Sequence, residues 1–147
     1  MYKFILFSFF ISLLTACDQA PNEAFSVKDA WVREAPPNAS MMAGYVTIKN
    51  NSNQERILTF AKSKQFNMVE IHRTIVEDGV AKMRQQDDLP IPAGGSLELK
   101  PGSYHLMLIG PKSALKATDE VTVTVCLKLD DDIKEIDIIM PVKKPNP

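Results

Sequence analysis

Apolar and polar positions alternate in short runs along most of the chain, and no stretch repeats its apolar residues with a helical period. The runs are rich in Val, Ile, Thr and Tyr, and Pro, Gly, Asn and Asp separate them, which is typical of an all-β protein. The predicted strands are Ser26–Arg33, Gly44–Lys49, Arg56–Ala61, Met68–Val76, Val80–Gln86, Ser96–Lys100, Tyr104–Ile109, Val121–Leu129 and Glu135–Pro141.

Turn-forming residues between the predicted strands indicate tight connections. This many short strands in one domain favours a Greek-key β-sandwich, with a closed barrel as the alternative. A short helical turn near Lys112–Leu115 is the one departure from all-β structure that the pattern allows. The predicted turns lie at Pro36-Pro37, Asn50–Asn53, Asp78-Gly79, Pro92–Gly95 and Pro101-Gly102.

The N-terminus has the pattern of a secretory signal. Lys3 precedes the apolar run Phe4–Leu14, which is too short to span a bilayer comfortably. The run ends in Leu14–Cys17, which resembles the signal of bacterial lipoproteins and implies that Cys17 is lipidated. The following Asp18 resembles the signal that retains many Gram-negative lipoproteins at the periplasmic face of the inner membrane. An ordinary signal peptide or an uncleaved anchor is the alternative.

These patterns predict four parts: a lipoprotein signal peptide (1–16), a lipidated tether (17–24), one β-sandwich domain (25–142) and a flexible tail (143–147). The domain is long enough for a single hydrophobic core. The net charge is −1 and there is no basic stripe, which argues against a nucleic-acid partner.

The two cysteines are not expected to pair. A secretory signal implies an oxidising compartment in which disulfides can form. If Cys17 carries lipid, however, Cys126 has no partner within the chain. Because Cys126 lies in the apolar run Val121–Leu129, we predict a buried, unreactive thiol, with a metal or redox role as the alternative.

The chain contains two histidines, and each is followed by a methionine in a predicted strand. The spacing is His72, ten residues, Met83, twenty-one residues, then His105-Leu-Met107. Neutral imidazole nitrogen with thioether sulfur, and no thiolate, is a ligand set for a soft cation, and Cu(I) fits it best. A zinc site would contain more nitrogen, carboxylate or thiolate.

Strand geometry allows each pair to chelate one ion. A two-residue turn at Asp78-Gly79 would place His72 and Met83 on one face as diagonal neighbours. A three-residue loop would move Met83 to the opposite face. His105 and Met107 alternate along one strand and therefore share a face. Local patterns do not predict that the two pairs meet.

Other residues of these strands are expected to support the site or the core. Leu106 and Leu108 alternate with the site residues and should point into the core. Glu70 and Met68 share the predicted face of His72, which makes both candidate neighbours of the site rather than ligands. A single strand methionine usually fills the core, and this is the prediction for Met41, Met42, Met68 and Met140.

No enzymatic activity is predicted. The sequence contains no GxSxG, P-loop or HExxH pattern and no Cys–His pair suited to nucleophilic catalysis. An electron-transfer cupredoxin would place a Cys thiolate beside two histidines, and Cys126 lies in a different predicted strand from both. Two alternatives to a copper carrier remain. One is an electron-transfer cupredoxin, and the other is a lipid-anchored structural or binding lipoprotein without a copper role.

At the four motif residues the chain closely resembles the PCu(A)C family of periplasmic copper chaperones, whose pattern His-x10-Met-x21-His-x-Met it matches throughout. The resemblance also covers Trp31–Pro37, Ala43–Ile48, Leu89–Gly95 and Leu99–Gly110. It implies a cupredoxin-like β-sandwich that delivers copper toward cytochrome c oxidase, to the CuA subunit or a Sco-type protein. The Cu(I) ligands that it implies are His72, Met83, His105 and Met107.

Overall fold

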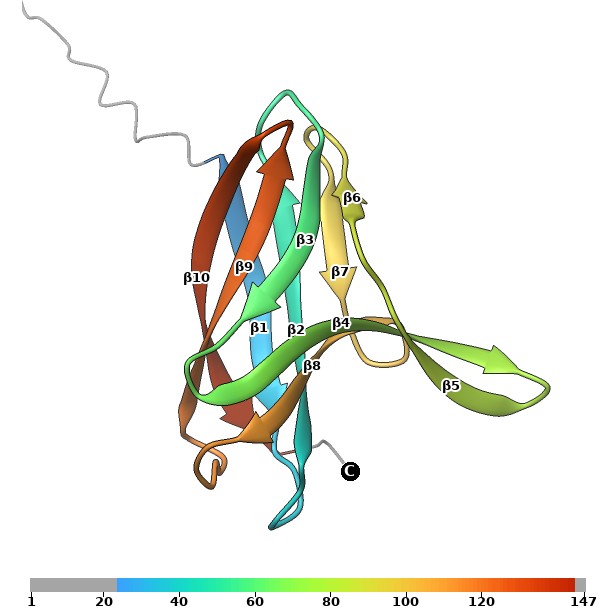
Figure 1. Cartoon of the computed structure of the whole chain (residues 1–147), viewed down its shortest axis with the longest axis vertical. Coiled ribbons are helices and arrows are strands. Elements are labelled where there is room, and N and C mark those ends of the chain that lie inside the picture. The colour runs from blue at the N-terminus through green and yellow to red at the C-terminus, as the bar shows by residue number, and fades with distance from the viewer. Residues whose placement is uncertain (1–23, 145–147) are drawn as a thin grey trace, which may run out of the picture.

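The structure is a computed structural model that describes residues 24–144. Every regular element in this range is a β-strand (Figure 1). The same range contains no helix long and apolar enough to cross a bilayer. The predicted signal peptide and the lipidation site at Cys17 lie outside the described residues. The strands are β1 (Phe25–Arg33), β2 (Met41–Asn50), β3 (Arg56–Lys62), β4 (Phe66–Glu77), β5 (Val80–Gln85), β6 (Leu89–Ile91), β7 (Ser96–Leu99), β8 (Tyr104–Pro111), β9 (Glu120–Leu129) and β10 (Asp132–Lys143).

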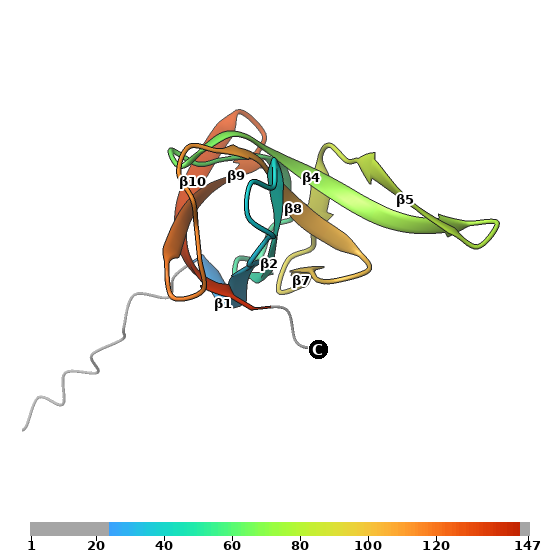
Figure 2. The same ribbon diagram turned by 90° about the horizontal axis from the view of Figure 1, so that it is seen from below.

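The strands form one hydrogen-bonded path, β5-β4-β8-β2-β1-β10-β9-β3-β6, and β7 pairs with β2. Figure 2 shows the path from below, where it curls round on itself, and the side chains that it encloses form one core cluster. Its halves are joined by the parallel pairing of β1 with β10, in which Val32 is the partner of Val142. Because β5 and β6 lie at the two ends of the path, the sheet stays open. The predicted all-β fold is confirmed, and the closed-barrel alternative is not formed.

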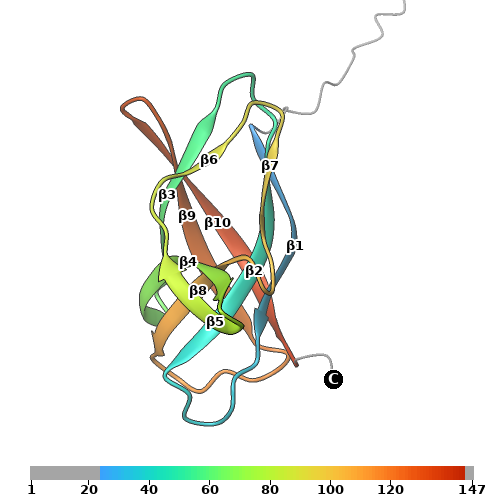
Figure 3. The same cartoon turned by 90° about the vertical axis from the view of Figure 1, so that its right-hand side faces the viewer.

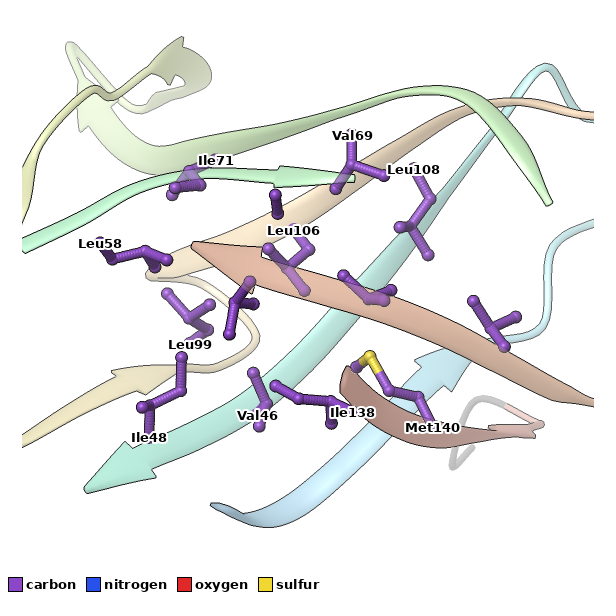
Figure 4. Close-up of a cluster of buried hydrophobic side chains, with 14 of the residues drawn as sticks. Val46, Ile48, Leu58, Val69, Ile71, Leu99, Leu106, Leu108, Ile138 and Met140 are labelled. Atoms are coloured by element: carbon purple, nitrogen blue, oxygen red, sulfur yellow. The ribbon is translucent and has the colours of Figure 1, made fainter. Parts of the chain in front are cut away.

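The core consists of inward-facing apolar side chains, most of them aliphatic, from most of the strands (Figure 4). On β8, Leu106 and Leu108 are fully buried, as the alternation predicts. Burying each of them is worth roughly 1.5–3 kcal/mol. Since successive side chains of a strand point to opposite faces, the intervening His105 and Met107 must lie on the outer face. The core therefore determines which face carries the candidate site.

The observed strands differ from the predicted ones mainly at their ends. β2 begins at Met41 rather than Gly44, and β10 continues to Lys143, beyond the predicted end of the domain. β6 is absent from the prediction because it is very short and contains Pro90, which is uncommon in strands.

The helical turn predicted near Lys112–Leu115 is not formed. The backbone amide of Lys112 donates to the carbonyl of Gln65 at 2.9 Å, and its ammonium donates to the carbonyl of Lys64 at 2.9 Å. These bonds hold the start of the segment against the connection between β3 and β4. They replace the local hydrogen bonds that a helical turn would need.

Cys126 lies on β9, on the face opposite the core residues Val125 and Leu127, and none of it is exposed. Its thiol points at Glu135, with Sγ 3.8 Å from Oε1, and burial raises the pKa of the thiol. The predicted burial is confirmed. A raised pKa keeps the group as the neutral thiol, which is a poor nucleophile and a poor metal ligand.

Candidate metal site

The β4–β5 hairpin projects from the sandwich (Figure 1), points toward the viewer in Figure 3, and carries two of the four motif residues. Asp78 and Gly79 have φ angles of 52° and 77°, which are the left-handed values that a tight two-residue turn requires. The register pairs Thr74 with Met83. The predicted register is thus confirmed, and Met83 is the diagonal neighbour of His72 on one face.

β8 pairs with the other edge of β4 and brings the two halves of the motif together. His72 is the register partner of His105, and Glu70 is the register partner of Met107. The two imidazole rings have centroids 5.9 Å apart and an interplanar angle of 59°. With Met83 on the adjoining β5, the four motif residues share the outer face of three neighbouring strands.

Each histidine has one ring nitrogen in a hydrogen bond and one without a partner. Nδ1 of His105 lies 3.1 Å from the carbonyl oxygen of Ser103, and it must carry the proton because a carbonyl only accepts. Nε2 of His72 lies 2.7 Å from Oε2 of Glu70, and the carboxylate accepts in the same way. The lone pairs remain on Nε2 of His105 and Nδ1 of His72, which are buried and unpartnered among the described residues.

The site is buried on the β8 side and open on the β5 side. His105 is 3% exposed and Met107 is 8% exposed, whereas Met83 is 58% exposed. Burial lowers the pKa of His105, and the nearby His72 lowers it further, against the opposing effect of the bond to Ser103. The ring is therefore held in the neutral form that metal binding requires.

Between His72 and its tip, the face of the hairpin that carries the motif is uncharged. The charged side chains of the hairpin lie on its opposite face, where Glu77 is 2.7 Å from Lys82 and 3.2 Å from Arg84. Glu70 is charged and lies on the motif face of β4, where His72 occupies its carboxylate. On the hairpin itself, the motif face consists of Thr74, Val76, Ala81, Met83 and Gln85.

The donor set suits a soft ion. Residues 24–144 contain no group of three or more His, Cys, Asp or Glu side chains placed to hold a metal ion. Cys126 lies on β9 with its thiol toward Glu135, so it does not join the imidazoles as a blue-copper centre would need. The remaining donors, imidazole and thioether, match Cu(I).

Two of the methionines that were predicted to fill the core lie outside it. Met41 is 48% exposed and Met68 is 53% exposed, so the core prediction is wrong for both, whereas the predicted position of Met68 on the face of His72 is confirmed. Both are register partners of Ile109, which places them on the outer face beside the motif. The alternation of β4 contained this signal, because an inward-facing Val69 requires an outward-facing Met68. The other two, Met42 and Met140, are buried as predicted.

Ser103 supports the site through its backbone carbonyl, a role that the sequence did not predict. Its carbonyl oxygen accepts from His105 and also from the backbone amide of Thr74 at 3.1 Å. It therefore ties the start of β8 to the hairpin. A backbone carbonyl leaves no residue-type signal, and only Gly102, with φ of 76°, indicates that the chain turns tightly here.

Comparison with known families assigns the chain to one of them. A model of the LpqE-like family, described as "Putative lipoprotein LpqE-like", matches residues 25–138, which include all four motif residues. The chain belongs to this LpqE-like family. One relative, "Putative lipoprotein Lxx21020" of Leifsonia xyli subsp. xyli, is 32% identical over 116 residues, which are 76% of this chain and 69% of that protein.

Solved structures share the fold of this LpqE-like chain. The solution structure of apo-DR1885 from Deinococcus radiodurans is 28% identical, has a TM-score of 0.61 and covers 99% of this chain and 97% of its own. The CuI-DR1885 structure is 27% identical, with a TM-score of 0.60 and coverage of 88% and 83%. The copper-bound PCuAC domain from PmoF2 is 17% identical, with a TM-score of 0.67 and coverage of 83% and 94%, which shows a common fold. The predicted PCu(A)C resemblance is confirmed.

Proposed function

We propose that this LpqE-like protein is a Cu(I)-binding metallochaperone in which His72, Met83, His105 and Met107 hold the ion. The observation that carries the proposal is the pair of facing imidazoles, each with a buried nitrogen lone pair that has no partner among the described residues. Two thioethers lie on the same face. The 27% identical structure of DR1885 is its CuI form, which supports the same cargo here.

Binding would use Nδ1 of His72 and Nε2 of His105, because the other nitrogen of each ring is held by Glu70 or Ser103. A fixed second nitrogen orients the ring and raises its basicity toward a metal. Both thioethers are neutral, so only the imidazoles compete with protons for the site. Because all four donors are neutral, the complex would keep the single positive charge of Cu(I).

Release would begin at Met83. It lies on β5 at the open end of the sheet and is the most exposed of the four donors, whereas Met107 is nearly buried. A partner that approaches this edge would reach the Met83 side of the ion first. Exchange of one neutral thioether for a ligand of the partner leaves the ion bound at every stage, which suits a carrier.

The acceptor in this proposal is a copper protein of cytochrome c oxidase assembly, either the CuA subunit or a Sco-type protein. This step rests on the sequence resemblance to the PCu(A)C family. Deletion of the protein should lower cytochrome oxidase activity under copper limitation, and added copper should restore the activity. Normal oxidase activity at low copper would remove the delivery role and leave the copper site as a separate question.

The proposed location is the periplasmic face of the inner membrane, through lipid on Cys17. Membership of a family described as lipoproteins supports the anchor, and acyl chains supply membrane affinity through their buried methylenes. Cys17→Ser should block processing or release the domain from membranes. Mass spectrometry that finds Cys17 unmodified in the mature protein would contradict the anchor.

The copper site itself is tested by Cu(I) titration against a competing chelator. Loss of a residue that hydrogen-bonds a metal ligand typically lowers the metal affinity about 10–100-fold. We expect His72→Ala and His105→Ala, which remove a ligand itself, to lower the Cu(I) affinity by at least this factor. Met83→Leu and Met107→Leu, which keep side-chain volume but remove sulfur, should weaken it less. Val80→Leu is the matched control, because Val80 lies on the same hairpin but on its opposite face.

Two outcomes would contradict the copper proposal. One is an unchanged Cu(I) affinity in all four ligand variants while they remain folded. The other is equal binding of Zn(II) and Cu(I) in direct competition, because a soft donor set should prefer Cu(I).

A further inference from the structure

The methionines of the described residues fall into two groups. Met42 and Met140 are buried in the core. Every other methionine of residues 24–144 lies on the outer face that carries the two histidines. Methionine is among the residues most often buried, so exposed methionines gathered on one face call for a reason. Met83 and Met107 belong to the motif, which leaves Met41 and Met68 without a role.

The register places these two methionines on either side of Met107. Met41 on β2 and Met68 on β4 are both partners of Ile109, which is two residues from Met107 on the same face of β8. Each is therefore a diagonal neighbour of Met107, at a backbone separation of about 7–8 Å. A methionine side chain has three rotatable bonds, so two diagonal thioethers can reach one ion.

Exposure falls steeply from these methionines to the proposed site. Met41 is 48% exposed and Met68 is 53% exposed, whereas Met107 is 8% exposed and His105 is 3% exposed. An incoming ion therefore meets a more exposed donor before it reaches the buried ones. On the β5 side that donor is Met83, and along β8 it is the pair that flanks Met107.

We propose that Met41 and Met68, together with Met107, form a thioether subsite that captures Cu(I) and passes it to the two histidines. This inference rests on the proposed copper function. The passage is a ligand exchange: an imidazole lone pair bonds to copper as an outer thioether leaves, Met107 stays bound, and the ion remains Cu(I). Thioethers do not protonate near neutral pH, so capture does not compete with protons.

The subsite is tested first in a His72→Ala, His105→Ala double variant with ¹³C-labelled methionine methyl groups. Cu(I) is added without oxygen, and the methyl signals are followed by NMR. The methyl signals of Met41, Met68 and Met107 should shift together. Shifts confined to Met107 or Met83, or no binding at all, would overturn the subsite.

A second test keeps both histidines and measures the rate of uptake. Met41→Leu with Met68→Leu should slow Cu(I) transfer from a chelator about tenfold while the equilibrium affinity stays unchanged. Ile133→Leu with Ile139→Leu, at exposed positions on β10, is the control and should leave the rate unchanged. An unaltered rate in the methionine variant would overturn the capture role. If the wild-type protein binds no Cu(I), the proposed function itself fails, whereas normal binding with unaltered uptake removes the subsite alone.

Discussion

The carboxylate of Glu70 lies 2.7 Å from Nε2 of His72. His72 follows Glu70 by two positions on β4, so both side chains lie on the same face of the strand. Because the carboxylate accepts a hydrogen bond from Nε2–H, the lone pair of the ring remains on Nδ1, which is buried and has no partner among the described residues. Glu70 thus determines which nitrogen of His72 can bind a metal. It also holds the ring beside His105, whose centroid is 5.9 Å away.

Replacing Glu70 tests this relationship. Glu70→Leu should lower the Cu(I) affinity by about 10–100-fold, the usual effect of losing an outer-shell partner. ¹⁵N NMR of the copper-free protein should show His72 protonated on Nε2 in the wild type and a mixture of tautomers in the variant. Glu98→Gln, at an exposed glutamate on β7 paired with Lys100, is the matched control. A wild-type tautomer and affinity in Glu70→Leu would show that Glu70 does not position the ring.

The Asp78-Gly79 turn should determine whether Met83 can reach the ion. Inserting one residue between them should shift the register of β5 by one and move Met83 to the face of Glu77 and Arg84. The Cu(I) affinity should then fall to the value of Met83→Leu. Cross-strand nuclear Overhauser effects would confirm the new register. Full affinity in a protein with a shifted register would exclude Met83 as a ligand.

Cys126 should contribute to stability and not to copper binding. Cys126→Ala removes a small, fully buried group and should cost about 1 kcal/mol, measured by urea unfolding. The copper stoichiometry should stay the same, because the thiol faces Glu135 on β10 rather than the histidines. A folded variant that no longer binds copper would contradict this assignment.

The lowered pKa of His105 predicts a pH dependence of the unfolding free energy. In the unfolded chain the ring protonates near its ordinary pKa of 6.5, whereas burial resists protonation in the fold. The unfolded state therefore binds more protons as pH falls below about 6.5, and the copper-free protein loses stability there. His105→Asn should weaken this dependence in urea unfolding at pH 7.5 and 5.5. An equal change in unfolding free energy between the two pH values in both proteins would contradict this role of His105.

Much of the site could be predicted because it depends on local geometry. The Asp78-Gly79 pair specified the hairpin register, and the alternation of β8 placed Leu106 inside and His105 outside. The pairing of β4 with β8 could not be predicted, because the local pattern of a strand does not identify its distant neighbour. Met68 shows the reverse case: residue type suggested the core, although the phase of its strand placed it outside.

The central claim is that two imidazole nitrogens and two thioether sulfurs bind one Cu(I). X-ray absorption spectroscopy of the protein loaded with one equivalent of Cu(I) tests it most directly, because the scattering of nitrogen and sulfur neighbours differs. The account predicts both shells around the same ion, with a weaker sulfur shell in Met83→Leu. A spectrum of the wild-type protein without a sulfur shell would contradict it.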